Sequence, residues 1–222
     1  MKAGAPLEGG RDETMEAHSP NGRPIISIFG SYSPRPGEPL YDQAYAVGHA
    51  LARSGYVVCN GGYDGTMEAS AKGARDAGGQ TIGVTCAVFS DYRGMPLKAN
   101  RWIDREILHD NVFSRIDCMM RMSAGYVVLE GGTGTLVELG VVWEYVCKGL
   151  IEPRPIFVVG DFWCPVVERI RGVRPKSCQH VYCVESSEAI VSRLSELLRA
   201  TPPLPGEGYQ STPPLSKRGL GG

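Results

Sequence analysis

The sequence lacks the features that mark a protein of the membrane or of nucleic acids. Its 23 basic and 24 acidic residues leave a formal net charge of −1, which gives no electrostatic attraction to a phosphate backbone or an anionic surface. No apolar run reaches the roughly 18 residues that a membrane-spanning helix needs. The first 23 residues are polar and contain no secretory apolar segment. Neither a membrane nor a nucleic acid is therefore expected as a partner.

Cysteine pairs at metal-binding or redox spacing are also missing. The seven cysteines are scattered without a Cys-x-x-Cys motif, and several lie in apolar runs. This usage predicts a reducing, cytoplasmic location. Cys178, His180 and Cys183 form a cluster of three soft ligands, but the sequence offers no clear fourth, so no metal site is expected.

Several common catalytic motifs are absent as well. The chain has no Gly-x-Ser-x-Gly, no Gly-x-x-x-x-Gly-Lys-[Ser/Thr] and no dinucleotide fingerprint after its first strand. These absences disfavour a serine hydrolase, a P-loop protein and a conventional dinucleotide-binding protein. Pyridoxal chemistry needs a lysine in the pocket, and Lys72, Lys98 and Lys148 lie away from every glycine turn at the expected ligand edge. A pyridoxal-dependent decarboxylase is excluded on that ground.

The composition predicts one folded body between two tails. Residues 1–23 are rich in glycine, proline and charge, and residues 201–222 are rich in proline and glycine, so both are expected to be disordered or flexible. Residues 24–200 have the length and apolar content to form a single domain.

Within this body, strand-like and helix-like segments alternate. Such alternation predicts an α/β fold with a doubly wound parallel sheet that is covered on both faces. Residues 99–107 fit neither pattern clearly and are expected near a sheet edge. The predicted strands are 25–29, 56–59, 81–85, 126–129, 156–159 and 181–184, and the predicted helices are 41–53, 66–77, 111–123, 136–147, 162–171 and 187–199.

Three glycine turns follow predicted strands. Gly30-Ser31 follows the first, Gly61-Gly62-Tyr63-Asp64-Gly65 the second, and Gly131 to Gly134 the strand at 126–129. Ligands of parallel sheets bind beyond the carboxyl ends of the strands. Three such turns at one edge predict a shared ligand groove.

The third turn is the most informative motif. In Gly131-Gly132-Thr133-Gly134-Thr135, glycines between a strand and a helix can bring backbone amides around a phosphate. Glu138 follows in the first helical turn. It fits a capping box with Thr135, which is a purely structural role, and it also fits a catalytic carboxylate that orients water or stabilises a cationic transition state. Spacing alone leaves both interpretations open.

Arg115 is the candidate cationic partner. It lies near the start of the helix that precedes the 126–129 strand, so it is expected at the same edge as the glycine turns. Phe113, Ile116 and Met120 form the predicted apolar stripe, which leaves Arg115 pointing elsewhere. It is either a solvated arginine or a phosphate ligand. Arg121 is a rival that lies further from the edge.

Together these residues resemble the Lonely Guy family, whose members have also been labelled lysine decarboxylases. Its glycine–threonine–glutamate motif corresponds to Gly131-Gly132-Thr133-Gly134-Thr135-Leu-Val-Glu138, its upstream arginine to Arg115, and its other glycine turn and helix to residues 60–79. The resemblance implies a Rossmann-like homodimer without a cofactor that releases a free base and ribose 5-phosphate from an AMP-like nucleoside 5′-monophosphate, including cytokinin nucleotides. It implies that Glu138 and Arg115 are catalytic and that the glycine turns bind the nucleotide.

The sequence departs from the family pattern at two positions. Ile116 replaces the lysine that usually follows the arginine, and Glu130 replaces the proline before Gly131. Some relatives bind nucleotides or cofactors without this reaction, such as molybdenum-cofactor carriers. A non-catalytic carrier of a nucleotide or of the molybdenum cofactor is therefore the alternative function.

Overall fold

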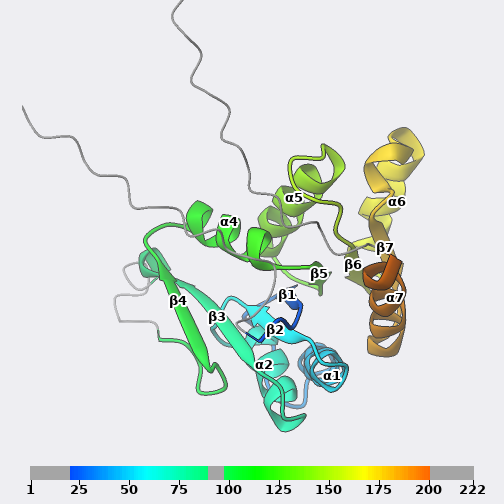
Figure 1. The fold of residues 1–222 in the computed structure, drawn as a ribbon. Helices are drawn as coiled ribbons and strands as arrows, with labels where there is room; N and C mark the ends of the chain where they lie inside the picture. The colour runs from blue at the N-terminus through cyan, green and yellow to red at the C-terminus, as the bar shows by residue number, and fades with distance from the viewer. Residues whose placement is uncertain (1–20, 90–97, 201–222) are drawn as a thin grey trace, which may run out of the picture.

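The computed structural model describes residues 21–89 and 98–200, and within them it contains a seven-stranded sheet in the order β4-β3-β2-β1-β5-β6-β7 (Figure 1). Every neighbouring pair is parallel. The predicted doubly wound α/β fold is thus confirmed. The strands are β1 (Ile25–Phe29), β2 (Val57–Asn60), β3 (Thr81–Cys86), β4 (Arg105–His109), β5 (Gly125–Val128), β6 (Ile156–Val159) and β7 (Val181–Val184).

Helices cover both faces of this sheet (Figure 1). One face carries α4, α5 and α6, and the other carries α1, α2 and α7. The helices are α1 (Pro39–Arg53), α2 (Thr66–Asp76), α4 (Val112–Met122), α5 (Thr133–Cys147), α6 (Cys164–Val173) and α7 (Ser187–Ala200), with a short 3-10 helix η1 (Pro175–Cys178) before β7.

The alternation of side chains along the strands explains the two cores. In β1, Ile25 and Phe29 pack under α4, α5 and α6, whereas Ile26 and Ile28 pack under α1, α2 and α7. All four are almost fully buried, as expected for a parallel strand covered on both faces. Between them Ser27 is also buried, and its hydroxyl pairs with Ser123 at 2.6 Å.

Helices α1 and α2 pack unusually closely. A Cβ atom at Gly48 would lie 2.0 Å from the backbone oxygen of Ser70, and one at Gly73 would lie 2.1 Å from that of Tyr45. Only glycine fits at such a helix–helix crossing. Both helices begin at the carboxyl edge of the sheet, since each follows the end of a strand.

Residues 99–107, which the sequence left ambiguous, contain the start of the edge strand β4. Its side chains are exposed or half-buried, so the strand shows neither a continuous apolar run nor a clear alternation. Apart from residues 21–23, the two predicted tails lie outside the described residues. Across the described ranges, no helix is both long and apolar enough to cross a membrane.

Candidate functional site

The three glycine turns meet at the carboxyl ends of β2, β1 and β5, which are neighbours in the sheet. Backbone hydrogen bonds join them. The amide of Ser31 donates to the carbonyl oxygen of Glu130 at 3.2 Å, which ties the first turn to the third. The amide and the hydroxyl of Thr66, at the start of α2, donate to the carbonyl oxygen of Ser31 at 2.8 and 2.9 Å, which ties the first turn to the second. The predicted shared edge is therefore a single connected surface.

Several positions in these turns require glycine. A Cβ atom at Gly30 would lie 2.6 Å from the Thr66 hydroxyl, and one at Gly131 would lie 2.2 Å from the Thr135 hydroxyl. Gly62 has a φ of +80°, a conformation that side chains disfavour. Its amide donates to the buried side chain of Asn60 at 2.8 Å.

Helix α5 begins within the third turn. Gly132 is its N-cap and Thr133 its first residue, and no side chain caps it. The first amides of a helix have no acceptor within the helix, and the helix dipole makes this end partly positive. Gly132, Thr133 and Gly134 are exposed, whereas Thr135 is buried. The helix end is thus open to an anion.

Arg115 and Glu138 form a buried ion pair beside this edge. Nη1 of Arg115 lies 3.0 Å from Oε1 of Glu138, and the two side chains are only 6% and 12% exposed. The arginine Nε also donates to the carbonyl oxygen of Val84 at 2.7 Å, near the end of β3. These contacts fix the guanidinium between α4, β3 and α5.

Gly61 makes room for this arginine. A Cβ atom there would lie 2.1 Å from Nη2 of Arg115 and 2.6 Å from the sulfur of Met67. The second glycine turn therefore contacts the ion pair directly. One guanidinium connects β2, β3 and α5 at the site.

Burial raises the pKa of the Glu138 carboxyl above its ordinary value of 4.5, and the adjacent positive charge of Arg115 opposes that rise. The pKa of Glu138 therefore depends on burial, which favours the neutral carboxyl, and on Arg115, which favours the charged carboxylate. Such a group is typical of functional sites, although structural ion pairs show the same effect.

Two sequence interpretations are wrong at this site. Helix α5 begins at Thr133, three residues before the predicted start, so the capping-box interpretation of Thr135 and Glu138 fails: Glu138 lies beyond the cap and binds Arg115 instead. The apolar stripe predicted for α4 is right for Ile116 and Met120, which are buried, but wrong for Phe113. Phe113 is 78% exposed, and Arg115, at 5%, occupies the buried face with Ile116. The arginine side chain can be buried because Glu138 and Val84 provide hydrogen-bond acceptors for its guanidinium.

The remaining sequence candidates take structural positions. Gly65, the last residue of the second turn, is the N-cap of α2, and Thr66 is the first residue of that helix. Arg121 is exposed and bonds to Asp117 at 2.9 Å, one turn earlier on the same helix, away from the Arg115–Glu138 pair. Ile116 is 2% exposed, and Glu130 is exposed beside the third turn.

Sequence reasoning missed the aromatic wall of the site. The ring of Phe89 lies 5.8 Å from the guanidinium carbon of Arg115 and contacts the Tyr63 ring edge-on at 5.9 Å. Tyr63 itself is held by Cys86, whose amide donates to the phenol oxygen at 2.8 Å. No periodicity or motif distinguished these two aromatic residues.

It also missed two residues that hold the turns. Asn100 donates its side-chain amide to the carbonyl oxygens of Gly62 and Tyr63 at 3.1 and 2.8 Å, and Trp163 donates its indole N–H to the carbonyl oxygen of Leu129 at 3.0 Å. Both come from segments remote from the turns in sequence.

Comparison with protein families gives a match over more than half of the chain. Residues 23–156 match the model of the SLOG cluster4 family. This range includes all three glycine turns, Arg115 and Glu138. The match confirms the resemblance that the glycine–threonine–glutamate motif predicted.

Individual relatives cover much of the same range. The chain is 35% identical over 139 residues to a cytokinin riboside 5′-monophosphate phosphoribohydrolase of Mycobacterium tuberculosis, which is 62% of this chain and 71% of that protein. It is 34% identical over 107 residues to an uncharacterised protein of Archaeoglobus fulgidus, which is 47% of this chain and 64%, just under two thirds, of that protein.

The fold is shared with a solved structure as well. The molybdenum cofactor carrier protein of Chlamydomonas reinhardtii superposes with a TM-score of 0.65 over 80% of this chain and 99% of that chain. The sequences are 21% identical, so the comparison concerns the fold alone.

Proposed function

The chain belongs to the SLOG cluster4 family, and from this we propose that it is a nucleoside 5′-monophosphate phosphoribohydrolase that acts on AMP or on cytokinin nucleotides. The observation that carries the proposal is the buried Arg115–Glu138 pair beside three glycine turns. The mycobacterial relative named for this reaction supports it.

In the proposed complex, the phosphate binds at the N-terminus of α5. Gly132, Thr133 and Gly134 are exposed residues at the start of this helix, where free backbone amides and the helix dipole favour an anion. The turns at Gly30-Ser31 and Gly61-Gly62 would contact the rest of the nucleotide. Gly131 and Thr135 would shape the phosphate loop, because they touch one another closely.

Glu138 would perform the chemistry. Hydrolysis breaks the bond between ribose C1′ and the base nitrogen; water gives its hydroxyl to C1′ and a proton to the departing base. The transition state has oxocarbenium character, which a nearby carboxylate stabilises, and the same carboxylate can orient the water. Arg115 would keep Glu138 ionised despite its burial, since a neighbouring guanidinium favours the charged carboxylate.

The assay of this proposal uses purified protein with AMP and with a cytokinin riboside 5′-monophosphate. Chromatography of the products should show free base and ribose 5-phosphate in equal amounts. If neither free base nor ribose 5-phosphate appears with either substrate, the proposal is overturned.

The alternative is a carrier that binds a nucleotide or the molybdenum cofactor on the same turns without turnover. The fold that this chain shares with the molybdenum cofactor carrier protein of Chlamydomonas reinhardtii fits this alternative. Calorimetry separates the two functions. Tight binding of AMP without any release of base would favour the carrier.

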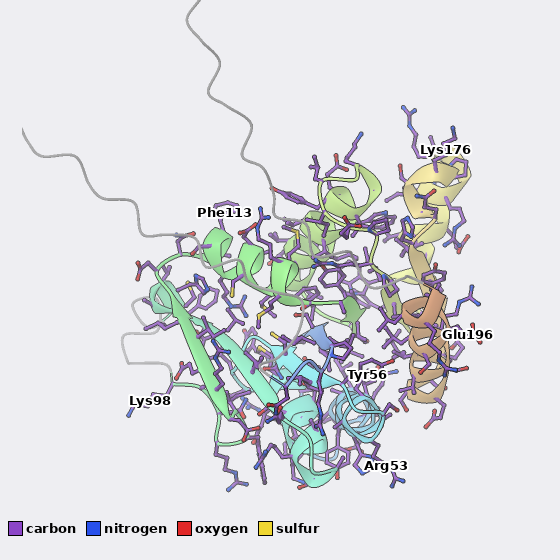
Figure 2. All side chains as sticks on the ribbon, in the orientation of Figure 1. Arg53, Tyr56, Lys98, Phe113, Lys176 and Glu196 are labelled. Atoms are coloured by element: carbon purple, nitrogen blue, oxygen red, sulfur yellow. The ribbon has the colours of Figure 1, made fainter. Side chains whose placement is uncertain are left out.

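We also propose that the protein is a cytoplasmic homodimer. Phe113 on α4 is 78% exposed (Figure 2), and Leu108 on the edge strand β4, five positions earlier in the chain, is 65% exposed, so a second copy of the chain could cover both side chains. Light scattering should give twice the monomer mass. Phe113→Glu should then shift the protein toward the monomer, whereas a monomeric wild type would contradict the proposal.

A further inference from the structure

A cavity lies beside the N-terminal turns of α1 and α2, on the sheet face opposite α4 and α5. Its volume is about 370 Å³. Its described lining comes from the first two turns of the two helices, from residues 36–37 just before α1, and from Arg101, which lies before β4. The ion pair of the candidate active site comes from α4 and α5, which cover the other face of the sheet.

Charges of both signs surround this cavity. Asp42 and Glu68 bring carboxylates, and Lys72 and Arg101 bring positive charges. Lys72 binds Asp76 at 2.6 Å, whereas the other three charged groups form no ion pair with any residue in the described part of the chain. Three charged groups at one cavity are therefore open to a ligand.

Aromatic rings complete the wall. Tyr41 is 5% exposed, and Tyr45 donates its hydroxyl to Asp76 at 3.0 Å. The Lys72 ammonium lies 4.8 Å from the centre of the Tyr45 ring. Burial, and after it the negative charge of Glu68, raises the pKa of Tyr41, while the positive charges of Lys72 and Arg101 oppose the rise. The phenol thus stays neutral between opposite charges.

This arrangement selects among ligand classes. Asp42 and Arg101 are exposed and Glu68 is half-buried, so a ligand can reach all three charges. Inorganic phosphate would be repelled by Asp42 and Glu68, and a neutral nucleobase would use none of the three charges. A divalent cation would be opposed by Arg101 and Lys72, and no cluster of three metal-binding side chains exists among residues 21–89 and 98–200. A molecule that carries both an ammonium and a carboxylate can pair with the acidic and the basic side chains at the same time.

We propose that this cavity binds a small zwitterion of the free α-amino acid class. Its ammonium would pair with Glu68 and Asp42, its carboxylate with Arg101, and its side chain would lie against the rings of Tyr41 and Tyr45. The volume is sufficient for a large amino acid. This binding site does not depend on the function proposed for the glycine turns.

The test is calorimetry of the full chain with each of the common L-amino acids, alongside AMP, adenine and inorganic phosphate. We expect at least one amino acid to bind, and its N-acetyl derivative and its amide to bind at least tenfold more weakly, because each derivative lacks one charge. No binding at about 5 mM, where a Kd of about 1 mM would still be visible, would overturn the proposal. Equal binding of the derivatives would overturn it too.

Substitutions of the charged residues that line the cavity test whether the amino acid binds there. Glu68→Gln and Arg101→Gln should each weaken the amino acid at least tenfold. Arg53→Gln is the matched control, since Arg53 is an exposed charge at the far end of α1 (Figure 2) and should leave the affinity unchanged. Glu138→Gln should also leave it unchanged. Loss of amino-acid binding in Glu138→Gln, or competition by AMP, would contradict a separate site.

Discussion

The Arg115 guanidinium binds the Glu138 carboxylate at 3.0 Å, although the two residues are 23 positions apart in the chain. Both side chains are buried away from water, so each charge is stabilised mainly by the opposite charge of the other residue. Burying an ion pair gives little net stability, but removing one partner leaves a costly unpaired charge. The fold therefore keeps two buried charges together, and removal of either one alone should be costly.

Arg115→Met should destabilise the protein by about 3 kcal/mol at neutral pH, because it leaves Glu138 buried without a counter-charge. The double variant Arg115→Met with Glu138→Gln should recover most of this loss, since no charge remains buried. Urea denaturation of the wild type, both single variants and the double variant measures the coupling. Additive losses would show that the two side chains do not interact.

The pH dependence of stability should report on Glu138. Its pKa is raised in the folded state, so between the ordinary value of 4.5 and the raised value the folded protein holds more protons than the unfolded chain. Stability contributed by this group is therefore lost as pH rises through that window. Glu138→Gln removes this contribution, so its unfolding free energy relative to wild type should increase as pH rises above about 4.5.

Denaturation curves at several pH values measure that difference, and the other titrating groups cancel in the comparison. A difference that stays constant with pH, or that decreases as pH rises, would show that the carboxyl is not shifted upward.

Gly61→Ala tests how closely the second turn holds Arg115. The added Cβ would lie 2.1 Å from Nη2, so the guanidinium must move. We expect a loss of about 1–3 kcal/mol in stability, typical of overpacking, and a fall in turnover.

Gly140→Ala in α5 is the control, because no atom lies within 4 Å of its added Cβ. That helical substitution should stabilise by up to about 1 kcal/mol. Equal behaviour of the two variants would contradict the contact.

Most of the architecture could be predicted from the sequence because buried parallel strands carry strong apolar signals. The strands at Ile25–Phe29, Ile156–Val159 and Val181–Val184 were predicted with the bounds that the structure shows. β4 could not be predicted, because an exposed edge strand carries no such pattern.

At the candidate site, the sequence identified the glycine turns and the two charged residues but not how they meet. The burial of Arg115 depends on Glu138 and Val84, which approach it only in three dimensions, so helical periodicity placed Phe113 inside and Arg115 outside. The start of α5 was misplaced because Gly132 caps it without a side-chain hydrogen bond, which leaves no sequence signal. The roles of the glycine turns in binding and of Glu138 in catalysis stay predictions.

The most direct measurement is the rate of adenine release from AMP by the wild type and by Glu138→Gln, with AMP affinity determined by calorimetry on the same preparations. We expect the variant to lose about 100-fold or more in turnover, as for the loss of an acid–base group, while its AMP affinity changes by only a few fold. A variant that releases adenine at the wild-type rate would contradict the catalytic role of Glu138.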